Sequence, residues 1–561
     1  MILSSFETTN KQKFNFHSWR SLFGFNLAIT LFNLSFCLGI SSLLAKKALG
    51  AEEIYLNYGA LEFSVSVKSL ENYARYGKIE GELQSYAGFL TPEQLEKFKV
   101  GLTTNANLNS LAIAQFLYSY QGEKILERMS KVIKTKAFQP GFYAIRSALI
   151  LAAADQEAGG LTPLNVLKKF PTQSIRIDSK QGLEIIDNLS TVVQENNNAI
   201  AAVEQEATKE SQEDASGPVD SPNIELFQPG NYTYRQQLLT LNDRYRQRVF
   251  PVDLYLPVNK TNKLLSLVII SHGLGGDRTT FEYLAKHLAS HGLAVAVPEH
   301  PGSSASQIQA LLSGLTSDVT PPQELIDRPL DIKFLLDKLT KDYGKKLDTQ
   351  NVGIIGQSFG AYTALALAGA RLNFQTLKQE CANLDDSWNL SLLLQCLALQ
   401  LPPTKTYIDL KDDRITSAIA INPLTSAVFG EKSLSRIKIP LMLISGSSDP
   451  ITPALPEQIR PFTWLTTREK YLVLLQGGTH FSTLSESAGS IPVPAQAIGP
   501  NPKLAQSYIK QLGLAFFGTY VAKQPAYSNY LNAKYVSHMS RSEIPLSLVD
   551  LLDPQSLELK Q

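Results

Sequence analysis

The sequence predicts an α/β protein: a mainly helical region followed by a mostly parallel, doubly wound sheet. From about residue 244 onward, short apolar runs end in Gly, Ser, Asp or His, which is typical of strands buried on both faces. The clearest of these runs are 264–271, 292–298, 351–355, 415–421, 439–445 and 470–475. Helical patterns separate most of them, and such alternation favours a parallel sheet with helices on both sides.

Length and charge restrict the functions that this chain can have. Its 561 residues predict two or three domains. The net charge is +1, so the chain has no basic excess with which to neutralise a phosphate backbone. We therefore expect no nucleic-acid partner.

Residues 1–51 are predicted to be a signal peptide or an N-terminal anchor. Basic residues precede an apolar run at 21–45, and small residues follow it up to Ala51. The run is longer than a usual signal sequence and is followed by Lys46 and Lys47, so an uncleaved membrane anchor is the alternative. Both interpretations predict an exported protein, periplasmic or extracellular, that is able to associate with a membrane surface.

Residues 52–202 are predicted to form a helical accessory domain. Residues 52–67 alternate in polarity and predict a hairpin, after which apolar residues recur at helical spacing. Thr91 and Gln94 have the spacing of a capping box at a helix start. The next segment, 203–222, is rich in acidic residues, Ser and Pro and lacks aromatic residues, which predicts a flexible acidic linker.

The segment "GQSFG" contains the strongest chemical signal. Ser358 lies between a predicted strand at 351–355 and a predicted helix at 359–370. Gly356 and Gly360 leave room for the sharp strand-to-helix turn that lifts a nucleophilic serine above a sheet. We therefore predict that Ser358 is a nucleophile in acyl-transfer chemistry.

A serine nucleophile needs a base and an acid. In a sheet of this kind the three residues follow one another along the chain in the order serine, acid, histidine. His480 follows the predicted strand at 470–475 after a short loop with two glycines, whereas His538 lies in a polar tail. His480 is therefore the predicted base. Asp449 directly follows the strand at 439–445 and is the predicted acid. The other aspartates between nucleophile and base lie in the segment before residue 415: Asp385, Asp386, Asp409, Asp412 and Asp413.

Two backbone N–H groups are predicted to form an oxyanion hole. One belongs to Phe359, the residue after the nucleophile, and the other to Leu274 in the loop after the third strand. His272 in that loop is expected to stabilise the turn. Glu299 and His300 are expected at the rim of the pocket, without a chemical role.

These residues resemble a known family. The blocks "SHGLGGDRTTFEYLAKHLASHGLAVAVPEHPGSS", "GQSFGAYTALALAG" and "DRPLDIKFLLDKL" are similar to α/β-hydrolases related to platelet-activating factor acetylhydrolase, over about residues 225–520. The helical N-terminal part resembles that of a group of exported cyanobacterial hydrolases. The resemblance implies an α/β-hydrolase fold and a calcium-independent, cofactor-free esterase that removes short or oxidised acyl chains from phospholipids. Ser358, Leu274 and Phe359 match the family's nucleophile and oxyanion donors.

The chain departs from that family in one respect. The family's acid follows the strand after the nucleophile helix, where this sequence has Asn422. The predicted acid therefore lies one strand later, at Asp449. This difference weakens the inference that the chain shares the narrow acetylhydrolase specificity.

The catalytic domain is predicted to span 223–525, with an insertion at 371–413 and a C-terminal extension at 526–561. The insertion is strongly apolar and is either a lid over an acyl pocket or a helix packed on the domain. Cys381 and Cys396 within it are predicted to form a disulfide, with two buried thiols as the alternative.

Together these features predict a serine ester hydrolase acting on lipid-like or short-acyl esters. Two alternatives stay open. The same triad could serve a peptidase, thioesterase or acyltransferase, and the fold could serve as a non-catalytic binding protein. Acyl length, head group and oligomeric state are not predicted.

Overall fold

A computed structural model describes residues 50–58, 61–213, 225–258, 263–402, 406–485 and 495–557. Nearly all of the predicted targeting segment, 1–51, lies outside these ranges. Within them, no helix combines the length and apolarity needed to cross a membrane.

The N-terminal part is mainly helical, as predicted, but it also contains a sheet. The predicted hairpin is confirmed as the antiparallel pair β1 (Glu53–Tyr58) and β2 (Leu61–Ser66). Two short strands that sequence reasoning missed, β3 (Ile133–Thr135) and β4 (Ser174–Asp178), extend it in the order β2-β1-β4-β3. The helices are α2 (Val67–Tyr76), α3 (Glu82–Ala87), α4 (Pro92–Thr103), α5 (Ser110–Leu117), α6 (Tyr120–Val132), α7 (Phe142–Ala154) and α8 (Pro163–Lys169).

The capping box predicted at the start of α4 is confirmed. Gln94 N–H donates to Thr91 Oγ1 at 3.2 Å, and Thr91 N–H donates to Gln94 Oε1 at 2.8 Å. The two bonds satisfy N–H groups that have no acceptor within the helix.

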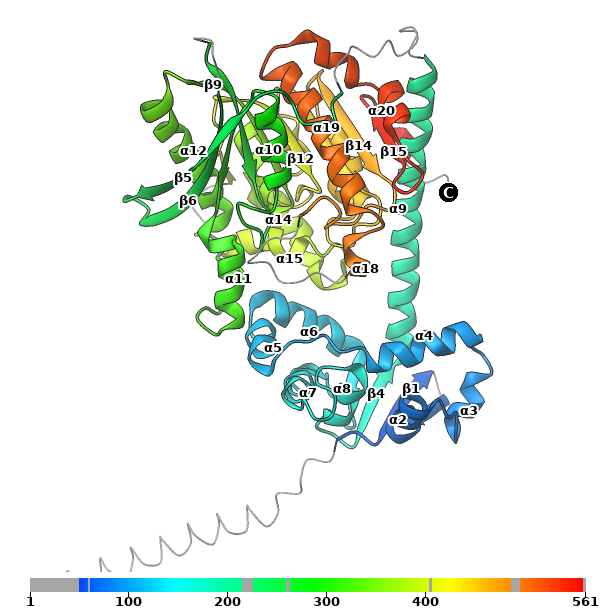
Figure 1. The fold of residues 1–561 in the computed structure, drawn as a ribbon. Coiled ribbons are helices and arrows are strands. Elements are labelled where there is room, and N and C mark those ends of the chain that lie inside the picture. The colour runs from blue at the N-terminus through cyan, green and yellow to red at the C-terminus, as the bar shows by residue number, and fades with distance from the viewer. Residues whose placement is uncertain are drawn as a thin grey trace, which may run out of the picture.

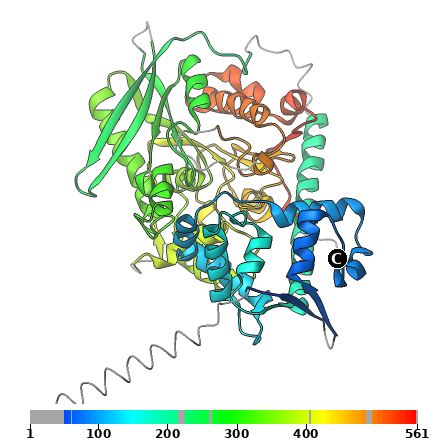
Figure 2. The same ribbon diagram turned by 60° about the horizontal axis from the view of Figure 1, so that its bottom comes forward.

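The predicted flexible linker is wrong over its first half. Residues Ser179–Glu213 form one helix, α9, which leaves the N-terminal part and runs along the side of the large sheet (Figures 1 and 2). Ala199, Val203 and Ala207 recur every fourth residue and are buried against the core. This packing stabilises a helix in a segment whose acidic composition suggested a linker. Residues 214–222 lie outside the described ranges.

The large sheet has the predicted doubly wound arrangement, with nine strands in the order β15-β14-β13-β12-β9-β7-β8-β6-β5. The six central strands, from β14 to β8, are parallel, and antiparallel strands flank them. The strands are β5 (Tyr234–Asp243), β6 (Arg248–Pro257), β7 (Leu265–Ser271), β8 (Ala294–Pro298), β9 (Leu347–Gln357), β12 (Ile415–Ile421), β13 (Leu441–Gly446), β14 (Lys470–Leu475) and β15 (Leu546–Val549).

Both faces of this sheet are covered, which explains its continuous apolar strands. Leu267 and Ile269 of β7 face a core formed with α12 (Glu324–Tyr343) and α13 (Phe359–Ala368). Val268 and Ile270 face the opposite core. The helices of that second core are α10 (Glu282–Ser290), α19 (Pro502–Tyr520) and α20 (Ala533–Met539).

The C-terminal extension is part of this architecture. Its strand β15 pairs antiparallel with β14, and α20 packs beside it, so the extension completes one edge of the sheet. Shorter elements fill the loops: η1 (Pro301–Ser303), α11 (Ala305–Leu312), α16 (Glu431–Leu434), η4 (Leu455–Ile459), α17 (Arg460–Trp464), α18 (Ala495–Ile498), η5 (Pro525–Tyr530) and η6 (Pro554–Leu557).

The described part of the insertion at 371–413 packs on the core of the domain. It contains β10 (Leu372–Asn373), α14 (Phe374–Glu380), η2 (Cys381–Asp386), α15 (Leu392–Gln395), η3 (Cys396–Gln400) and β11 (Tyr407–Ile408). Leu392, Leu394 and Leu397 are buried in the same core as α13. A disulfide joins Cys381 to Cys396. These contacts favour the packed helix over a mobile lid.

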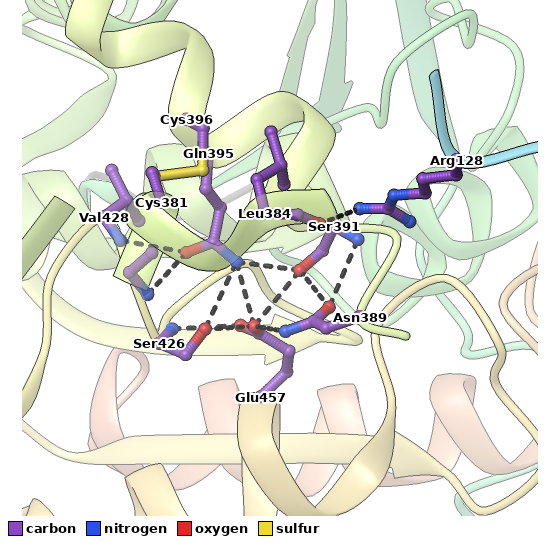
Figure 3. The surroundings of a disulfide bond; sticks show 11 residues. Arg128, Cys381, Leu384, Asn389, Ser391, Gln395, Cys396, Ser426, Val428 and Glu457 are labelled. Atoms are coloured by element: carbon purple, nitrogen blue, oxygen red, sulfur yellow. Dashed lines mark hydrogen bonds between the residues drawn. A yellow bond between two sulfur atoms is a disulfide. The ribbon is translucent and has the colours of Figure 1, made fainter. Parts of the chain in front are cut away.

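One buried carboxylate anchors the insertion from below (Figure 3). Glu457 of η4 is fully buried and accepts hydrogen bonds from both sides. The insertion supplies side-chain donors: Asn389 Nδ2 at 2.5 Å, Gln395 Nε2 at 2.9 Å and Ser391 Oγ at 3.1 Å. The loop after β12 supplies the backbone N–H groups of Thr425 and Ser426 and both of their hydroxyls. A carboxylate offers acceptors only, which suits a position where donors converge from two sides.

We predict that Glu457→Gln destabilises the protein by about 3 kcal/mol, because the amide replaces an acceptor by a donor that faces other donors. Urea unfolding measures the change. Glu380→Gln, on the exposed surface of α14, is the matched control. Equal unfolding midpoints for the two variants would contradict the anchoring role.

Candidate active site

Ser358 lies at the turn between β9 and α13, as the sequence predicts. Its φ of 55° and ψ of −116° are strained for a residue other than glycine. A Cβ at Gly356 would lie 2.1 Å from the carbonyl oxygen of Gly360, and one at Gly360 would lie 1.9 Å from that of Ser271. Side chains at either position are therefore excluded, which is the physical reason for the Gly-x-Ser-x-Gly pattern here.

The predicted base and acid are in direct contact. His480 Nδ1 lies 2.7 Å from Asp449 Oδ2, and the Asp449 side chain is fully buried. Asp449 also accepts from the N–H groups of Ile451 (2.7 Å) and Thr452 (2.9 Å) and from Thr452 Oγ1 (2.7 Å). These donors fix the carboxylate, so Nδ1 of His480 carries the proton and Nε2 is left to accept one.

The loops that hold Ser358 and His480 meet at the same edge of the sheet. Gln357 Nε2 donates to the carbonyl oxygen of His480 at 3.1 Å. A Cβ at Gly446, at the end of β13, would lie 2.6 Å from the carbonyl oxygen of Gly478. In the described residues, His480 bonds to Asp449 and Gln357 and has no hydrogen bond to Ser358. Catalytic hydrogen bonds are often long or poorly aligned until substrate binds.

Asn422, directly after β12, joins the loop that carries Asp449 to the loop that carries His480. Its Oδ1 accepts from Gly446 N–H at 2.9 Å, and its Nδ2 donates to the carbonyl oxygen of Thr479 at 3.4 Å. Its own N–H donates to the carbonyl oxygen of Ile444 at 2.8 Å. The amide therefore supports the two loops, while Asp449 supplies the charge.

The two predicted oxyanion donors lie beside Ser358. Phe359 is the first residue of α13, so its N–H has no acceptor within the helix. A Cβ on Gly273 would lie 3.4 Å from Cβ of Ser358, which places the Leu274 loop against the serine. In the described part of the chain, neither the Leu274 N–H nor the Phe359 N–H donates to an acceptor.

His272 has the turn-stabilising contacts expected of it. Its Nδ1–H donates to the carbonyl oxygen of Gly273 at 2.7 Å, and its Nε2 accepts from His300 N–H at 3.0 Å. Burial lowers the pKa of His272 well below its usual value, so the ring is neutral.

The prediction that His300 lines the pocket rim is wrong. His300 is fully buried, and its Nδ1 lies 2.9 Å from Asp331 Oδ2. The His300 side chain, which follows β8, belongs to an internal polar network and does not face solvent. Glu299 is half-buried and pairs with Arg278 at 3.2 Å, while burial raises the pKa of the Glu299 carboxyl.

The site is covered on the side where the parallel strands end. Ser358 is 7% exposed and His480 is 5% exposed. In the N-terminal part, α5 packs against α11, and α6 packs against η2 and α15 of the insertion (Figure 1). The N-terminal helices therefore border the elements that surround the sheet edge where Ser358 and His480 lie.

Sequence reasoning missed three supporting residues: Gln357, Thr452 and Arg328. Gln357 lies inside the Gly-x-Ser-x-Gly pattern, and Thr452 has the i+3 spacing at which a hydroxyl reaches back to an aspartate. Arg328 lies in an amphipathic helix, where an arginine is usually exposed. Only the folded structure shows that it is buried.

Comparison with protein families supports the fold class. Residues 50–178 match a family described as an alpha/beta hydrolase of unknown function (DUF1400). Residues 233–323 match the family of platelet-activating factor acetylhydrolase, isoform II. A search of curated proteins found no match.

The fold and these matches define the class: the chain has an α/β-hydrolase fold. More narrowly, residues 233–323 are similar to the platelet-activating factor acetylhydrolase family, and this match spans β5 through the segment after α11.

We predict that Gly360→Ala yields protein with a markedly lower melting temperature, because its methyl group would overlap the carbonyl oxygen of Ser271. Gly101→Ala is the control, since a Cβ there meets nothing within 4 Å and lies in α4. Thermal unfolding of the two variants measures the difference. A melting temperature for Gly360→Ala equal to that of the control would show that the turn is not as tight as described.

Proposed function

We propose that the protein is a serine carboxylic-ester hydrolase that works through an acyl-enzyme. The observation that supports this most strongly is the buried pair of His480 and Asp449, at the sheet edge where Ser358 stands in a strained turn. A histidine whose Nδ1 is held by a carboxylate presents Nε2 as a general base.

In this proposal Ser358 Oγ attacks the ester carbonyl while His480 Nε2 takes its proton. The carbonyl oxygen becomes negative and accepts hydrogen bonds from the N–H groups of Leu274 and Phe359. The intermediate then collapses, and the leaving alcohol receives the proton from His480. Water, activated by the same imidazole, attacks the acyl-enzyme and releases the carboxylic acid and free Ser358.

We propose lipid-like or short-acyl esters as substrates. The match to the platelet-activating factor acetylhydrolase family supports this class. The position of Asn422 argues against transferring that family's narrow specificity. An exported location is also proposed, and the disulfide between Cys381 and Cys396 supports it because such bonds persist in oxidising compartments.

We predict that Ser358→Ala lowers p-nitrophenyl butyrate hydrolysis by at least ~10³-fold while the melting temperature stays near that of the wild type. A fluorophosphonate probe should label the wild type and not this variant. Ser313→Ala, at an exposed serine after α11, is the matched control and should retain both activities.

Turnover that persists in Ser358→Ala would refute the proposal. A panel of ester, thioester and peptide substrates of equal acyl length then separates the reaction types. Faster turnover of the thioester or the peptide would indicate that the same triad serves a thioesterase or a peptidase instead of an esterase.

A further inference from the structure

The motif "DRPLD" at the start of α12 has no role in the mechanism above. Its arginine, Arg328, is fully buried. Burial lowers the pKa of the Arg328 guanidinium to about 9, which still leaves it protonated at neutral pH. A charged side chain held so deeply must have partners that outweigh the cost of removing it from water.

The partners of Arg328 belong to both halves of the predicted oxyanion hole. Its Nη2 donates to the carbonyl oxygen of His272, in the loop that presents the N–H of Leu274. Its Cζ lies 4.6 Å from the ring centroid of Phe359, the residue that presents the second N–H. A planar guanidinium can form hydrogen bonds in its plane and stack on a ring at the same time.

The remaining donors fix the guanidinium in one orientation. Nε donates to Thr363 Oγ1 of α13 at 3.1 Å, Nη1 to Ser303 Oγ at 2.6 Å and Nη2 to Ser271 Oγ at 3.2 Å. These acceptors come from the nucleophile helix, the loop after β8 and the end of β7. One side chain thus ties together three elements that surround the oxyanion site.

A closed buried network holds the acceptors in turn. Ser303 Oγ donates to Glu324 Oε2 at 2.9 Å, and Glu324 pairs with Arg248 at 2.6 Å. Ser271 Oγ lies 3.1 Å from His300 Nε2, and the opposite ring nitrogen faces Asp331. Asp331 also pairs with Arg248 at 2.9 Å, which closes the network.

We propose that Arg328 is a positioning residue that sets the orientation of the two oxyanion donors. By holding the His272 carbonyl oxygen, it fixes the backbone that leads to the Leu274 N–H, and by stacking on Phe359 it fixes the start of α13. This inference rests on the proposed esterase function. It gives the arginine of the DRPLD motif a role in placing the groups that stabilise the transition state, in addition to any role in stability.

The test compares Arg328→Met and Arg328→Lys with the wild type and with Arg248→Met. Arg248 belongs to the same buried network, but its described contacts are to Glu324, Asp327 and Asp331 and include neither oxyanion loop. The readouts are kcat and KM for p-nitrophenyl butyrate and the inhibition constant of an alkyl trifluoromethyl ketone. That ketone forms a tetrahedral adduct whose oxygen occupies the oxyanion hole. Melting temperature is measured in parallel.

For Arg328→Met we expect kcat to fall about 10- to 100-fold, somewhat less than removal of a whole donor costs, with KM little changed. The inhibition constant should rise by a similar factor. Arg328→Lys should give a smaller loss of the same kind, and it tests the proposal if the methionine variant does not fold. Arg248→Met should lower the melting temperature without weakening the ketone relative to substrate.

Two results would overturn the inference: unchanged kcat in a folded Arg328 variant, or a loss of kcat with unchanged ketone affinity. A weakening of the ketone in Arg248→Met equal to that in the Arg328 variants would also overturn it, because the effect would then be general destabilisation. An inactive wild-type protein that no fluorophosphonate labels is a different result, since it refutes the esterase proposal itself.

Discussion

The candidate site depends on one buried hydrogen bond, between Nδ1 of His480 and the carboxylate of Asp449. A carboxylate without solvent is stable only when donors surround it, and here two backbone N–H groups and a threonine hydroxyl do so. The same contacts fix the imidazole tautomer. Everything proposed for Ser358 follows from an imidazole held in that state beside a strained turn.

Much of the remaining molecule supports the loops that make this bond. Asn422 links the acid loop to the histidine loop, and Glu457 fixes the turn after the acid loop to the insertion. On the outside, Asn196 of α9 accepts from Leu455 N–H at 2.9 Å, and Glu204 of α9 accepts from Gln476. The helix that leaves the N-terminal part therefore contacts segments close to the loops that carry Asp449 and His480.

The sequence predicts those features that depend on local patterns. Strands buried on both faces are apolar throughout, and the turn around Ser358 demands glycines. Chain order limits the candidates for base and acid, and their positions at strand ends favour His480 and Asp449. Prediction from the sequence fails where contacts between distant parts of the chain determine the local structure. The acidic segment after residue 202 is helical because Val203 and Ala207 are buried against the core. His300 is internal because its ring pairs with the buried carboxylate of Asp331. Strands β3 and β4 are too short for their pattern to stand out.

The most direct test of the central claim is a crystal structure of the protein after reaction with diethyl p-nitrophenyl phosphate. We expect phosphorus bonded to Ser358 Oγ, with its unesterified oxygen about 3 Å from the N–H groups of Leu274 and Phe359. His480 Nε2 should lie within hydrogen-bond reach of the adduct, with Nδ1 still on Asp449. Phosphorus on another side chain, or an oxygen directed away from both N–H groups, would contradict the account.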